Sequence, residues 1–188
     1  MTFKKEVLKL SPDHQWDASP GYNLAVLDRG AVRFEIPRNW VCAPDEDSVK
    51  FTDVEPPQDS CRIAASRPSF PRVADQVPIR ELVDLATQAD ARVVLAKGEI
   101  AAVTRGSLEL AWIELRFTDP HEQREAVSRL CLARNVGVYA LITIEFWVDE
   151  AAEFSPVWDH VLETLRLGEL ILDPTVGRGV KRNRPETS

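Results

Sequence analysis

The sequence predicts an α+β fold in which one antiparallel sheet of about six to seven strands carries helices on both faces. The strongest observation is the segment 138–148, where every even position is apolar and about half of the odd positions are apolar. A strand with this pattern lies near the middle of a sheet that is at least partly covered on both sides. Two amphipathic segments, at 78–90 and after residue 153, are suited to form the two covers.

The length and composition suit one domain. The chain has 188 residues, of which 44% are hydrophobic, enough for a core of its own. We expect an irregular lead-in at 1–20, a single domain at 21–173 and a flexible basic tail at 174–188. No apolar run approaches the roughly 20 residues that span a bilayer, and the first residues lack the apolar centre of a secretory signal. The predicted location is therefore the cytoplasm.

The first half of the chain predicts short strands separated by turns, followed by a helix. Pro37 ends one strand because it has no N–H for the ladder. Residues 43–59 are rich in acidic side chains and predict a loop that contains one short strand. The first clear helix is expected at 78–90, with Pro78 at its first position. The strand segments are Tyr22–Leu27, Val32–Ile36, Val49–Thr52 and Arg62–Ser66.

The second half predicts longer strands and then a second helix. Short polar connections favour antiparallel pairing between neighbours. The last helix is expected to begin at Ser155, a capping residue, and Pro156, and to stop at Gly168. The strand segments are 92–97 and 99–104 around Gly98, then 108–118, 126–133 and 138–148.

No residue pattern in the chain is typical of catalysis or of a cofactor. Phosphate-binding glycine loops, HExxH helices and GxSxG turns are absent from the sequence. The histidines His14, His121 and His160 have no second metal ligand at a suitable spacing, and His160 is expected on the polar side of the last helix. The three cysteines lie far apart, which indicates reduced thiols. We therefore expect a protein that is not an enzyme, with no catalytic residue, cofactor or metal.

The net charge of −7 is concentrated before residue 174, because the tail holds four basic side chains and one acid. An acidic body repels nucleic acids and anionic membranes and favours a protein partner with a basic surface. The oligomeric state stays open. The acidic loop lacks the glycine and alternation of a calcium-binding loop, so it suits solvent or a basic partner. The candidate partner-binding residues are Asp45, Glu46, Asp47, Asp53 and Glu55.

A second interpretation is a small-molecule binder or an enzyme. Glu114 and Glu145 lie in otherwise apolar strands, and two carboxylates that share one cavity can act as acid and base. The five tryptophans could line such a pocket. The alternative is that Glu145 pairs with Arg116 or Arg129 across the sheet, and that the tryptophans belong to the core.

Two segments resemble the Mog/PsbP-like superfamily. The segment 32–40, in which a strand ends at Pro37 and Trp40 follows, resembles the opening of these domains. The segment 162–167 is similar to the end of their last helix, where a hydrophobic residue, Ser or Thr, another hydrophobic residue and Arg follow in order. The resemblance covers residues 20–168 and implies a central antiparallel sheet with helices on both faces.

The resemblance implies several possible roles. Eukaryotic Mog-type members bind the small GTPase Ran and promote nucleotide release, and PsbP-type members are lumenal extrinsic proteins of photosystem II. The expected absence of a targeting segment counts against the photosystem role. No binding residue of the family can be carried over to this chain position by position. A non-catalytic interaction or accessory protein is therefore expected, and a toxin-neutralising or secretion-associated role is a further analogy.

Overall fold

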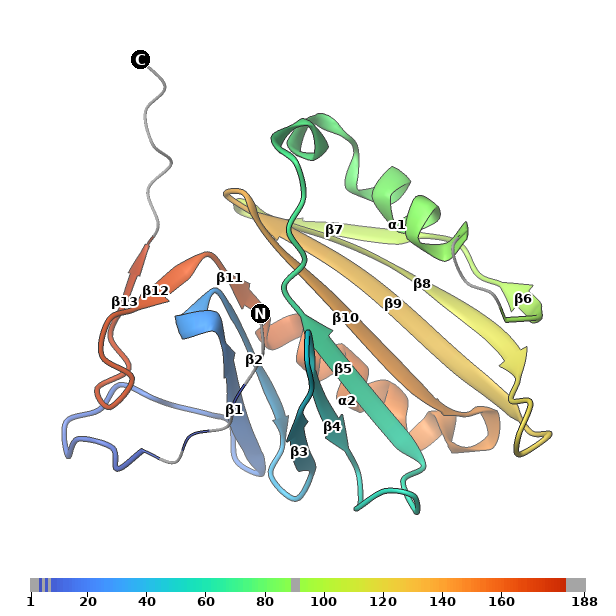
Figure 1. The fold of residues 1–188 in the computed structure, drawn as a ribbon, viewed down its shortest axis with the longest axis horizontal. Helices are drawn as coiled ribbons and strands as arrows, with labels where there is room; N and C mark the ends of the chain where they lie inside the picture. The colour runs from blue at the N-terminus through green and yellow to red at the C-terminus, as the bar shows by residue number, and fades with distance from the viewer. Residues whose placement is uncertain (1–3, 5, 7, 89–91, 182–188) are drawn as a thin grey trace.

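One large antiparallel sheet dominates the structure, and a helix covers each of its faces (Figure 1). The structure is a computed structural model that describes residues 4, 6, 8–88 and 92–181. The predicted α+β class is confirmed, and Val41–Pro44 adds a strand that the sequence does not predict. In spatial order the strands are β3 (Val41–Pro44), β4 (Val49–Thr52), β5 (Cys61–Ser66), β10 (Val138–Trp147), β9 (Glu125–Asn135), β8 (Leu108–Thr118) and β6 (Val94–Lys97), with β7 (Ala101–Arg105) also paired to β8.

Strand β10 lies near the middle of this sheet, between β5 and β9. Its even-numbered side chains are all buried on one face, as the uninterrupted apolar series predicts. Tyr139 and Leu141 lie on the opposite face, where Tyr139 belongs to a separate cluster of buried apolar side chains and Leu141 packs against it. The two-sided apolar pattern therefore corresponds to burial on both sides of one strand.

Two smaller sheets lie beside the large one. The first contains β1 (Tyr22–Leu27), β2 (Val32–Pro37) and β11 (Arg166–Leu167), and the second contains β12 (Glu169–Ile171) and β13 (Gly179–Lys181). Gly30, with φ of +88°, allows these sheets to approach closely, because a Cβ there would lie 2.5 Å from Cγ1 of Ile171. Short 3-10 turns occur at η1 (Asp28–Gly30), η2 (Arg72–Gln76) and η3 (Val148–Glu150).

The two ends of the described chain lie against each other. The indole Nε1 of Trp16 donates to the carbonyl of Pro174 at 2.7 Å, and the N–H of Gln15 donates to the carbonyl of Val176 at 2.7 Å. Part of the predicted flexible tail is therefore ordered, because β13 pairs with β12 as far as Lys181. Residues 182–188 of that predicted tail lie outside the described residues.

The last helix, α2 (Ala151–Thr164), has different bounds from those predicted. It begins four residues before Ser155 because η3 continues directly into it, so Pro156 lies inside the helix and removes one backbone hydrogen bond. It ends before Gly168 because Leu165 is extended and β11 pairs with β2. Pairing with a distant strand thus takes over the residues that would have formed its last turn.

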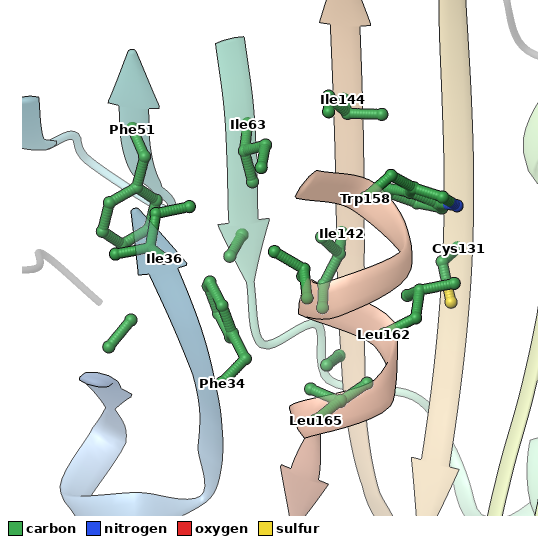
Figure 2. Packing of buried hydrophobic residues seen from close by; sticks show 14 of the residues in the cluster. Phe34, Ile36, Phe51, Ile63, Cys131, Ile142, Ile144, Trp158, Leu162 and Leu165 are labelled. Atoms are coloured by element: carbon green, nitrogen blue, oxygen red, sulfur yellow. The ribbon is translucent and has the colours of Figure 1, made fainter. Parts of the chain in front are cut away.

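The larger core lies between α2, β2 and one face of the sheet (Figure 2). Trp158 and Leu162 of α2, and Leu165 directly after it, point toward Ile142, Ile144 and Cys131 of the sheet. Phe34 and Phe51 meet edge to face with ring centroids 5.7 Å apart. Each fully buried large side chain contributes about 1.5–3 kcal/mol by removal from water.

The opposite face of the sheet is covered by α1 (Ile79–Gln88), as the sequence predicts. Its buried residues, Ile79 and Val83, contact apolar side chains of β8 and β9 such as Ile113 and Leu132. Arg134 of β9 holds the segment before this helix, because its Nη1 donates to the carbonyls of residues 74, 75 and 77 at 2.9–3.2 Å.

Trp158 provides a test of the larger core. Its side chain is buried, and its indole Nε1 has no hydrogen-bond partner among the described residues. We expect Trp158→Ala to lower the free energy of unfolding by about 3–5 kcal/mol, because it leaves a cavity. Trp158→Phe should cost less than Trp158→Ala, because it keeps one aromatic ring, leaves a smaller cavity and removes the unpaired donor. Urea unfolding measures both, and equal losses for the two variants would contradict this account of the site.

Candidate functional site

Three chain connections meet at one end of the large sheet (Figure 1). They are the β4–β5 connection (53–60), the β8–β9 turn (119–124) and the segment 148–153, which joins β10 to α2. Arg124 Nη2 donates to Asp149 Oδ1 at 2.6 Å and to Glu150 Oε1 at 3.4 Å. Ser60 Oγ donates to the same Glu150 oxygen at 3.4 Å. These bonds join the three connections into one continuous surface.

This surface, which we call the acidic end, is strongly negative. Two arginines at this end are already paired, Arg124 with Asp149 at 2.6 Å and Arg62 of β5 with Asp59 at 2.8 Å. The excess of carboxylates gives this end of the sheet a strong attraction for positive charge. Its nine carboxylates belong to Asp53, Glu55, Asp59, Asp119, Glu122, Glu125, Asp149, Glu150 and Glu153.

Two of these carboxylates shape the turns from which the others project. Asp53 Oδ1 accepts the N–H groups of Ser60 and Cys61 at 3.0 and 2.9 Å. Asp119 Oδ1 accepts the N–H groups of residues 121 and 122 at 2.8 and 2.9 Å, and these bonds lower the pKa of Asp119. Both side chains hold their loops in place through these bonds. The side chains of residues 55, 122, 125, 149 and 153 are exposed.

The negative field reaches into the core. Burial is the main cause that raises the pKa of the Cys61 thiol, and the charges of Asp53 and Glu150 raise it further. Burial also raises the pKa of Cys131. Both thiols are therefore protonated and unreactive at neutral pH.

The structure does not bring the five predicted partner-binding residues together. Asp53 and Glu55 belong to the acidic end, but Asp45, Glu46 and Asp47 lie in the β3–β4 turn at the opposite end of β4. Asp45 is also paired, with Lys50 Nζ 2.5 Å from its Oδ2. The expected acidic loop is therefore two turns separated by a strand.

Sequence reasoning missed the contributions of the β8–β9 turn and of the residues after β10. A signal for them was present, because β8 and β10 both pair antiparallel with β9 and so run in the same direction. Acidic residues that follow the ends of two such strands must lie at one end of the sheet. Combining the predicted strand directions with the positions of charges would have indicated this surface.

The alternative interpretation, in which Glu114 and Glu145 share one cavity, is wrong. The pairing registers place Glu114 on the α2 face of the sheet and Glu145 on the α1 face. Glu114 pairs with Arg129 Nε at 2.9 Å, and Glu145 pairs with Arg92 Nη1 at 2.5 Å. Two carboxylates on opposite faces cannot act together as acid and base on one substrate.

His160 occupies a less exposed site than the sequence predicts. Its Nε2 lies 2.8 Å from Oε2 of Glu35, and its ring stacks on Tyr22 with centroids 3.8 Å apart. The other Glu35 oxygen accepts the N–H of Ser19 at 3.2 Å. Burial alone would raise the pKa of Glu35, but the bonds from His160 and Ser19 outweigh burial and lower that pKa. These contacts of His160 and Glu35 join α2 to β1, β2 and the lead-in segment.

Two further classes of site are absent from the described ranges, which end at residue 181. No group of three or more His, Cys, Asp or Glu side chains there is placed to hold a metal ion. No helix in those same ranges is long and apolar enough to cross a membrane.

Comparison with known proteins identifies relatives over most of the chain. A family model described as Alr1449 matches residues 23–171. A protein of Nostoc sp. (strain PCC 7120), described as "Uncharacterized protein alr1449", is 42% identical over 175 residues. The match covers 92% of this chain and 91% of the Nostoc protein. The similarity therefore extends over nearly the whole length of both proteins.

Solved structures share the fold at low sequence identity. Cyanobacterial PsbP from Synechocystis has a TM-score of 0.52 and 15% identity, covering 80% of this chain and 94% of that one. LpqN of Mycobacterium tuberculosis, described as involved in cell envelope biogenesis, has a TM-score of 0.51 and 10% identity, covering 77% and 88%. A Bacteroides thetaiotaomicron structure has a TM-score of 0.55 and 15% identity, covers 78% of this chain, and is matched over 48% of its own length. The resemblance to PsbP-like domains is thus confirmed for the fold.

The Glu35–His160 contact should make the stability of the protein depend on pH. The lowered pKa of Glu35 means that its contribution to stability is present above the ordinary glutamate pKa of about 4.3 and is lost as pH falls through the folded-state pKa. We expect Glu35→Gln to lower the free energy of unfolding by about 1.5–3 kcal/mol at pH 7. The difference from wild type should shrink below pH about 4.

Urea unfolding at a series of pH values measures this difference. Glu163→Gln is a matched control, because Glu163 lies exposed on the same helix and should have little effect at any pH. A loss for Glu35→Gln that stays constant down to acid pH would show that the carboxylate charge is not what stabilises the contact.

Proposed function

The chain belongs to the Alr1449 family, and we propose that it is a non-catalytic interaction protein that binds a basic partner protein on the acidic end. The observation that carries this proposal is the convergence of eight carboxylates from three connections, together with Glu125 at the start of β9, at one end of a single sheet. Carboxylates concentrated in this way repel one another, and a basic partner relieves the repulsion.

The arrangement of the acidic end suits binding more than structural support. Its turns are held by backbone hydrogen bonds to Asp53 and Asp119, so the exposed carboxylates begin from ordered positions. Binding to preordered groups loses less conformational entropy than binding to a mobile loop. Long-range attraction to a surface of this charge also increases the rate of association with a basic partner.

One aromatic residue at this end is suited to contribute apolar contact. Trp147 ends β10 and is half-buried, and the guanidinium of Arg124 lies 4.8 Å from its ring centroid. Arg124 is held there by Asp149 and Glu150. A lysine or arginine of the partner would meet the same carboxylates beside this ring. Trp and Arg residues often contribute a large share of the binding free energy at protein interfaces.

The non-catalytic part of the proposal is supported by the placement of the reactive groups. The buried thiols of Cys61 and Cys131 have raised pKa values, which opposes their use as nucleophiles. Glu114 pairs with Arg129 on one face of the sheet, and Glu145 pairs with Arg92 on the other. His160 is stacked and hydrogen-bonded within the fold.

Charge reversal at the acidic end tests the proposal. We expect a variant with lysine in place of Glu55, Glu122, Glu125 and Glu153 to lose the proteins that the wild-type chain captures from a lysate of its own organism. These four side chains are exposed, so the fold should be retained. Capture by the wild type should also weaken as salt rises from about 0.1 to about 0.5 M, because salt screens exposed charges. Quantitative mass spectrometry of the captured proteins is the measurement.

A control with the same change in charge separates local from overall electrostatics. It carries lysine at Glu46, Asp47, Asp159 and Glu163, which are also exposed but lie outside the acidic end. We expect this control to capture the same proteins as the wild type. If both variants lose them equally, or if neither does, the acidic end is not the binding surface.

A further inference from the structure

Helix α1 covers only part of its face of the large sheet. It packs on β8 and β9, whereas β10 and β5 lie beside it (Figure 1). In the ranges that the structure describes, β10 and β5 have a helix only on their other face, where α2 lies. We call the uncovered area the open face. The pairing registers place six side chains on it: Lys50, Ala64, Ser66, Leu130, Leu141 and Thr143.

The two faces of β10 and β5 differ in burial. Under α2, Ile63 of β5 and Ile144 of β10 are 0% exposed. On the open face, Ala64 and Thr143 lie opposite each other and are only partly buried. An antiparallel sheet that faces water on one side carries mainly polar residues there, but Leu141 and Ala64 are apolar. The composition of the open face therefore suits contact with another molecule better than contact with water.

The charged side chains around the open face neutralise one another, so its net charge is small. Negative charge is in excess only at one end, where β10 reaches the acidic end and Trp147 lies on the same face. A molecule that covers the open face therefore needs a neutral stripe along its length and positive charge at one end. The ion pairs at the border are Lys50 with Asp45, Arg62 with Asp59, and Arg92 with Glu145.

The pairing of the strands decides what kind of segment can cover this area. Strand β10 is paired with β5 and β9, and β5 is paired with β4 and β10, so neither has a free edge for an added strand. A partner must meet the side chains instead. An α-helix is about 10 Å wide and neighbouring strands are about 4.8 Å apart, so one helix covers two strands. The open face thus has the width of one helix beside α1.

We propose that the open face is the docking site for an amphipathic helix of the basic partner, which lies along β10 and β5 with its positive side chains over the acidic end. This inference rests on the function proposed above and specifies the segment of the partner that binds. The ten residues of β10 span about 33 Å, so a helix of about 20 residues covers them. Leu141, Ala64 and the methyl group of Thr143 meet its apolar stripe, and Trp147 lies where that stripe gives way to the basic end.

A second copy of this chain offers no suitable helix among its described residues. The apolar stripe of α1 is buried against its own sheet through Ile79 and Val83, and Arg80 and Glu81 are exposed on its outer side. The apolar side chains of α2 are likewise buried in its own core. The occupant is therefore a helix of another protein.

Binding of a designed peptide to the full chain tests the proposal. The peptide has about 20 residues, with Leu and Ala along one helical stripe and Lys at one end. We expect fluorescence anisotropy to show that it binds at least about tenfold tighter than a peptide of the same composition in scrambled order. In NMR spectra of the wild type, the methyl signals of Ala64, Leu141 and Thr143 should shift on binding. Equal affinity for the two peptides, or shifts confined to other surfaces, overturns the proposal.

Arginine substitutions on the open face provide a second test. Thr143→Arg and Ala64→Arg should each weaken peptide binding about tenfold or more, because a long charged side chain then occupies the place of the helix. Thr104→Arg is the matched control, since Thr104 is exposed on β7, away from the open face, and should leave the affinity unchanged. Circular dichroism shows whether each variant is folded, and the NMR map decides without any substitution. Peptide binding that is insensitive to both folded open-face variants overturns the proposal.

The acidic-end lysine variant separates this inference from the proposed function. If that variant loses the captured proteins while Thr143→Arg keeps full peptide binding, the acidic end stands and the helix site is overturned. If the lysine variant captures the same proteins and binds the peptide as the wild type does, the proposed function is wrong, and this inference with it. Dimerisation in sedimentation velocity that Thr143→Arg abolishes would assign the open face to a second copy and also overturn the proposal.

Discussion

Burial of both faces of β10 is the constraint on which the rest of the structure depends. One face lies under α2, and the other contributes Tyr139 and Leu141 to the cluster below α1. Because a buried strand must also satisfy its backbone groups, it needs a partner on each side, which β5 and β9 provide. The positions of α2 and of the neighbouring strands then determine where β2 and β11 can attach.

The same antiparallel arrangement creates the acidic end. Strands that alternate in direction bring every second connection to one end of the sheet, however far apart these connections are in sequence. Asp53 and Asp119 use their charge to accept backbone N–H groups, and the exposed carboxylates around them create a negative surface. The fold therefore concentrates charge without needing an acidic run in the sequence.

The sequence by itself determined the fold class, the central strand, the long strands beside it and the helices on both faces, because alternation and helical periodicity record the burial of each residue. Only the tertiary structure decided which distant residues meet. Glu35 and His160 are 125 positions apart, the acidic end combines three separate connections, and β11 replaces the predicted last turn of α2. Local patterns carry no record of these contacts, because their energies depend on partners that approach only when the chain has folded.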